Sequence, residues 1–63
     1  MPVITIEGSK ITKEQKKNII NDVTEVLSKN YKIPTQSFTV IIHENDSENI
    51  GVSGKQLSEL IHK

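Results

Sequence analysis

The pair Met1-Pro2 is the feature of this chain with the clearest chemical potential. We expect Met1 to be removed ahead of the small second residue, which would leave the secondary amine of Pro2 as the chain terminus. A terminal amine has a pKa of about 7.7–8.0, and burial or a nearby cation lowers that pKa by disfavouring the charged form. Such an amine is partly unprotonated near neutral pH and can act as a general base. Pro2 is therefore the candidate catalytic residue, although proline also follows methionine in many unrelated proteins.

A strand and a long helix come first among the elements that must position this amine. Residues 3–7 are rich in β-branched side chains and end at Gly8, which predicts a short strand at the N-terminus. Thr12 and Gln15 have the spacing of a capping box, and apolar residues then recur at helical intervals. We therefore expect an amphipathic helix over residues 13–30.

The second half of the chain predicts one more central strand and two smaller elements. Residues 38–43 are nearly continuously apolar, as in a parallel strand covered on both faces. Pro34 closes the crossover before this strand, so strand, helix and strand form a right-handed β-α-β unit. A polar loop follows, and residues 50–54 predict a short strand or turn. The apolar spacing of residues 57–61 predicts a brief C-terminal helix. His62 would follow its last residue, where a basic side chain interacts favourably with the helix dipole.

Composition limits the classes of protein that fit. Sixty-three residues allow one domain, residues 1–63, and the absence of cysteine excludes disulfides and thiolate metal sites. One helix covers only one face of two strands, so we expect a homo-oligomer to cover the rest. Eight basic residues balance eight acidic ones, which argues against a nucleic-acid or anionic-membrane partner. The lack of a long apolar segment predicts a cytoplasmic protein.

Three motif matches are weaker than they first look. The G-x-x-G spacing of residues 51–54 fits a KH loop, but it holds no basic residue and a tight turn explains the glycines. The sequence around Lys55 lacks the remaining positions of a phosphate-binding loop. Acidic residues and His43 cluster in residues 43–48, but no calcium-loop spacing is met and a solvated turn accounts for them. We therefore expect neither a metal nor a cofactor.

Taken in order, the motifs of this chain resemble those of the 4-oxalocrotonate tautomerase family over nearly its whole length. The resemblance rests on Met1-Pro2 before a strand, on residues 14–16 at the helix start, on residues 40–42 with Glu44, and on residues 51–54. It implies an α/β fold, a small β-α-β unit of the tautomerase type with parallel strands, completed by assembly into dimers or hexamers. It also implies active sites between subunits, in which the terminal proline moves a proton on a keto or enol acid.

Residue by residue, the resemblance places the site as follows. Pro2 matches the family's general acid/base. The family's arginine after the first strand is replaced by Lys10, which supplies charge without a bidentate fork. Thr39 stands where the family has a second arginine, Ile50 where it has an aromatic wall, and Ser37 matches a serine. Solvation would explain Lys10 equally well, and packing alone would explain Thr39 and Ile50.

This pattern implies an isomerase whose base is intact and whose carboxylate clamp is weakened. A 2-keto acid with a single carboxylate fits one lysine better than a dicarboxylate does. The alternative is a non-catalytic oligomeric β-α-β protein that serves as a binding or assembly module. Hydration and decarboxylation on the same scaffold stay open, because no residue selects among these reactions.

Overall fold

The computed structural model describes residues 1–61, so the prediction for His62 lies outside the described residues. Two parallel strands, β1 (Val3–Gly8) and β2 (Thr39–Glu44), pair from the first residue of each strand to the last. Both predicted strands are confirmed, and both extend one residue further than expected. The second also begins one residue later, because the Phe38 N–H donates to the Thr35 carbonyl of a 3-10 turn instead of to the sheet.

The helix α1 (Lys13–Tyr31) connects the two strands, as predicted. The capping box is present in full: the Gln15 N–H donates to the Thr12 hydroxyl at 3.0 Å, and the Thr12 N–H donates to the Gln15 side chain at 2.9 Å. At the other end Lys32 adopts a left-handed conformation with φ of 63°, and its N–H donates to the Ser28 carbonyl. The chain then turns through the short 3-10 helix η1 (Thr35–Ser37) into β2.

The sheet has one partly covered face and one open face. Side chains of both strands alternate between half-buried and exposed positions through most of their length, as expected when one helix packs on one side. The half-buried positions are Ile4, Ile6 and Gly8 of β1 and Val40 and Ile42 of β2. We call the opposite side the open face; it presents the exposed residues Val3, Thr5, Glu7, Thr39, Ile41 and His43.

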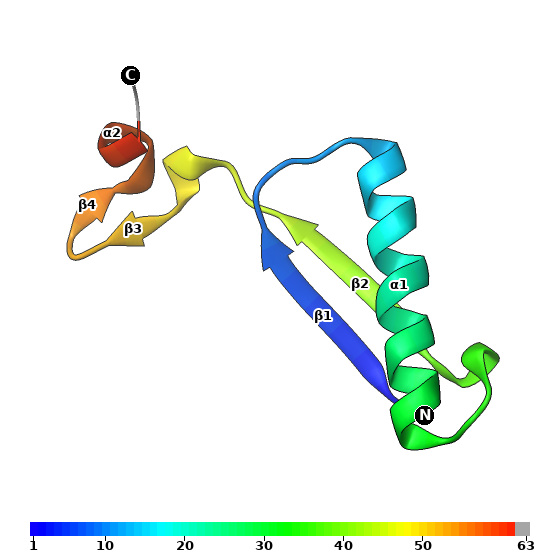
Figure 1. Ribbon diagram of the computed structural model, residues 1–63. Coiled ribbons are helices and arrows are strands. Elements are labelled where there is room, and N and C mark those ends of the chain that lie inside the picture. The colour runs from blue at the N-terminus through cyan, green and yellow to red at the C-terminus, as the bar shows by residue number, and fades with distance from the viewer. Residues whose placement is uncertain (62–63) are drawn as a thin grey trace.

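Residues 47–61 form a C-terminal arm that projects from the end of the strands opposite to the N-terminus (Figure 1). The arm contains the 3-10 helix η2 (Ser47–Asn49), the antiparallel strands β3 (Gly51–Val52) and β4 (Lys55–Gln56), and the helix α2 (Leu57–Ile61). Both the short strand and the brief helix predicted here are therefore confirmed.

The turn between β3 and β4 explains Gly54, whereas Gly51 lies within β3 and pairs with Gln56. Ser53 and Gly54 both have positive φ, 55° and 78°, which is the pattern of a two-residue hairpin turn. The prediction that both glycines serve a tight turn is confirmed for Gly54 but not for Gly51.

The described residues contain no side chain that is fully buried. The radius of gyration is 15.1 Å, whereas a compact chain of this length would have about 11 Å. Apolar side chains lie open on the body and on the arm: Val3 is 58% exposed, Val52 45% and Leu60 50%. Neither helix of residues 1–61 has the length and apolar character needed to cross a membrane. A chain with so little internal burial needs further contacts to be stable.

Candidate active site

Pro2 is held in place by the strand next to it. The Thr39 N–H donates to the Pro2 carbonyl at 3.1 Å, which extends the parallel ladder by one residue beyond Val3. Pro2 itself is half-buried, whereas the preceding Met1 is 89% exposed. Pro2 is therefore fixed by a backbone hydrogen bond, and Met1 is accessible to solvent.

Two other predicted site residues lie beside Pro2. Thr39 is the register partner of Val3, and its side chain is on the open face. Ser37, two residues before Thr39, is the last residue of η1 and is half-buried. Its N–H donates to the Pro34 carbonyl at 3.0 Å. Both strands start at this edge of the sheet because they are parallel. The structure thus brings Pro2, Ser37 and Thr39 to one end of the molecule.

Lys10 and Ile50 lie at the opposite end. Lys10 follows β1, and the six residues of that strand span about 17 Å between its first and last residue. Ile50 belongs to the arm, where its carbonyl accepts from the Leu57 N–H at 2.8 Å and its side chain is half-buried. Figure 1 shows both segments, the turn after β1 and the arm, at the far end of the strands from the N-terminus. Within one chain the predicted site is therefore split into two halves.

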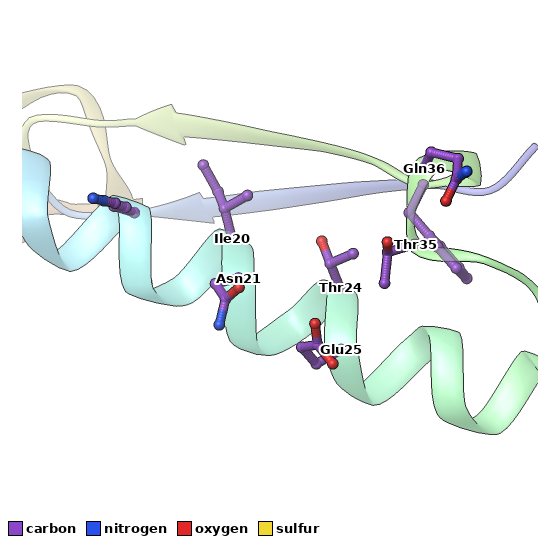
Figure 2. Close-up of a pocket in the computed structure, with 8 residues that line it drawn as sticks. Ile20, Asn21, Thr24, Glu25, Thr35 and Gln36 are labelled. Carbon is purple, nitrogen blue, oxygen red and sulfur yellow. The ribbon is translucent and has the colours of Figure 1, made fainter.

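A groove on the helix side of the molecule is separate from these residues. It has a volume of about 460 Å³ and lies between α1 and η1 (Figure 2). Ile20 and Phe38 supply its apolar surface, while Thr24 and Thr35 face it from its two sides. None of the five predicted site residues lines it, and its polar side chains form no catalytic arrangement.

A carboxylate and a histidine meet on the open face at the Lys10 end. Glu7 and His43 are register partners, with Glu7 Oε2 2.9 Å from His43 Nδ1. The Asn45 side-chain amide donates to Glu7 Oε1 at 2.8 Å. Hydrogen bonds from Asn45 and then from His43 lower the pKa of Glu7. Residues 1–61 contain no group of three or more ligands that could hold a metal, and His43 is paired with this carboxylate.

Glu44 is the residue to which sequence reasoning gave no role at the site. Its Oε2 accepts from the Ile11 N–H at 3.2 Å and lies 2.7 Å from Lys16 Nζ. The hydrogen bond from Lys16, and then that from the Ile11 backbone, lowers the pKa of Glu44. These partners are separated by about thirty residues in the sequence, so the parallel register was needed to find them.

Comparison with known proteins identifies the fold and its family. The model of the tautomerase enzyme family matches residues 2–60. A probable tautomerase of Listeria monocytogenes is 41% identical over 63 residues, covering 95% of this chain and all of that protein. The 2-hydroxymuconate tautomerase of Bacillus subtilis is 33% identical, covering 95% and 98%. The crystal structure of YwhB, a homologue of 4-oxalocrotonate tautomerase, aligns with a TM-score of 0.85 at 30% identity, covering 92% and 97%.

The chain therefore belongs to the tautomerase family, and the resemblance inferred from its motifs is confirmed. Its β-α-β unit with parallel strands has the tautomerase fold. Membership of the family implies an isomerase-type enzyme that acts on a small molecule and works as an oligomer.

Proposed function

We propose that this protein is a keto–enol tautomerase of 2-keto acids that uses the Pro2 amine as its general acid/base after removal of Met1. The observation that carries the proposal is the position of Pro2: half-buried, one residue ahead of β1 and tied to Thr39 through its carbonyl. A fixed secondary amine at this place meets the geometric requirement for a base, which must reach its proton reproducibly.

In the proposed reaction the unprotonated amine takes the proton of the enol hydroxyl and then returns a proton to carbon. The oxygen becomes the ketone carbonyl, so no proton is gained or lost overall. Lys10 binds the substrate carboxylate as a point charge, and Ile50 keeps water from the amine. Ser37 and Thr39, beside Pro2, offer hydroxyl groups to the substrate's oxygens. The reaction needs neither a metal nor a cofactor.

The proposed site is completed between subunits. Pro2, Ser37 and Thr39 lie at one end of the strands and Lys10 and Ile50 beyond the other, and β1 alone spans about 17 Å between these ends. A second copy with the opposite orientation brings its own Lys10 end to the Pro2 end of the first. The absence of a fully buried residue within residues 1–61 supports such an assembly. A homodimer or a hexamer would satisfy this requirement, and a cytoplasmic location stays a prediction.

The test is to replace Pro2 by alanine. Ketonisation of phenylenolpyruvate and of 2-hydroxymuconate is followed by absorbance. The mass of the intact protein, isolated from its natural source, is measured by mass spectrometry. We expect the mature protein to lack Met1. We expect the kcat of the Pro2→Ala variant to fall about 100-fold or more, which is the usual size of a general-base contribution. Unchanged rates in Pro2→Ala, or a retained Met1, would leave the non-catalytic binding or assembly module as the better account.

A further inference from the structure

The loop that carries Lys10 is fastened by contacts from two different elements. On one side of Ile11, the Thr12 N–H is held by the Gln15 side chain of α1. The Ile11 N–H itself donates to Glu44 Oε2, at the end of β2. Before the loop, the Gly8 carbonyl accepts from the Asn45 N–H at 2.8 Å. Lys10 is therefore adjacent to a residue whose backbone is tied to the last residue of β2.

The charges around Glu44 are arranged so that Lys10 is left available. Lys16 Nζ lies 2.7 Å from Glu44 Oε2 and neutralises that carboxylate directly. Lys10 lowers the pKa of Glu44 only through its charge, and this effect is smaller than those of Lys16 and of the Ile11 N–H. Among residues 1–61, Lys10 has no ion-pair partner within 4.0 Å. Its ammonium group can therefore pair with a ligand carboxylate without first breaking a salt bridge.

We propose that Glu44, with Lys16 as its counterion, is a positioning residue for Lys10, holding the loop so that the Lys10 ammonium is presented to the substrate carboxylate. This inference rests on the proposed function, because it assigns Lys10 to substrate binding. Glu44 fixes the backbone beside Lys10 through the Ile11 N–H. Because Lys16 pairs with Glu44, Glu44 does not form a salt bridge with Lys10.

Steady-state kinetics on phenylenolpyruvate tests the role of Glu44. We expect Glu44→Gln to raise KM about threefold to tenfold with kcat nearly unchanged, because a charge-assisted hydrogen bond outside the reacting atoms contributes to uniform binding. Lys10→Ala should raise KM at least as much, and Lys10→Ala combined with Glu44→Gln should be no worse than Lys10→Ala alone. Glu14→Gln is the matched control, since Glu14 carries the same charge in the first turn of α1 and its side chain forms no hydrogen bond or salt bridge within residues 1–61.

Lys16→Met separates the two parts of the proposal. It frees the Glu44 charge to pair with Lys10 but leaves the Ile11 hydrogen bond in place, so KM should rise while the Ile11 amide stays protected from hydrogen exchange. Glu44→Gln should instead accelerate exchange of that amide, because a neutral acceptor is weaker than a carboxylate. Lys16→Arg should restore the wild-type KM.

Two kinetic results would overturn the inference: a KM of Glu44→Gln equal to that of the wild type, or an effect of Glu44→Gln on KM that multiplies fully with the effect of Lys10→Ala. Unchanged Ile11 exchange in Glu44→Gln would also overturn it, and this measurement does not depend on turnover. Failure of the proposed function has a different signature, since Pro2→Ala would then keep its activity whatever happens at Glu44.

Discussion

At the scale of single residues, the proposed chemistry depends on how the backbone fixes each functional group. Pro2 needs no side-chain partner, because a carbonyl hydrogen bond to Thr39 and its own ring define its direction. Lys10 is the opposite case: its side chain is long and exposed, so the backbone next to it must be held by Glu44. The candidate base is predicted from the sequence, whereas the hydrogen bond that fixes the backbone beside the candidate cation is not.

Replacing Lys10 by arginine should strengthen the binding of substrate carboxylates. A guanidinium group forms two parallel hydrogen bonds with a carboxylate, whereas an ammonium group acts as a point charge. We expect Lys10→Arg to lower KM for the dicarboxylate 2-hydroxymuconate about threefold to tenfold, the value of one additional charged hydrogen bond at a partly exposed site. The change on phenylenolpyruvate should be similar in direction because it also has a carboxylate, and Lys10→Gln should raise KM on both. Equal KM values for lysine, arginine and glutamine would show that this side chain does not bind substrate.

At the scale of elements, local patterns predicted what local interactions determine. The capping box of Thr12 and Gln15 and the β-branched runs were enough to place α1, β1 and β2 within one or two residues. The strand was predicted to begin one residue too early, at Phe38. The Phe38 N–H donates to the carbonyl of a 3-10 turn, which no residue pattern predicted. The contact between Glu7 and His43 depends on the register of the parallel strands. The hydrophobic pattern limits the possible registers but does not identify which residues are paired.

The two carboxylates at the end of the strands should make stability depend on pH. The pKa values of Glu7 and Glu44 are lowered in the folded chain from 4.5, so at acid pH the unfolded chain binds more protons than the folded chain does. Their contribution is therefore complete above about pH 4.5 and is lost as pH falls through the lowered values.

Thermal unfolding at fixed protein concentration between pH 7 and pH 3 measures this effect. The difference in Tm between wild type and Glu44→Gln should be largest at neutral pH and should shrink steadily below about pH 4.5, where protonation removes the charge. Because both carboxylates are exposed to solvent, high salt should weaken the difference at neutral pH. A Tm difference that stays constant down to pH 3 would contradict an ionic role for Glu44.

At the scale of the whole molecule, the shape of one chain explains why the site could not be assembled from the sequence alone. The arm extends away from the body, the open face of the sheet is uncovered, and residues 1–61 bury no side chain fully. Family motifs placed five residues in one site, but a single chain keeps them at two ends. The missing information is the arrangement of a second copy, which no residue spacing within one chain encodes.

Mixing two impaired variants, assayed at a substrate concentration well below KM, tests whether each site takes Pro2 and Lys10 from different copies. Pro2→Ala and Lys10→Ala are each expected to be impaired, and joint refolding of equal amounts allows mixed oligomers to form. If the two residues of a site come from different chains, about a quarter of the sites in a randomly mixed assembly receive both native residues, as the symmetry of a repeated interface requires. Activity should then recover to about that fraction of wild type. If both residues come from one chain, every site keeps a defect and mixing restores nothing; Pro2→Ala refolded with Pro2→Ala/Lys10→Ala is the matched control, because neither chain supplies the base.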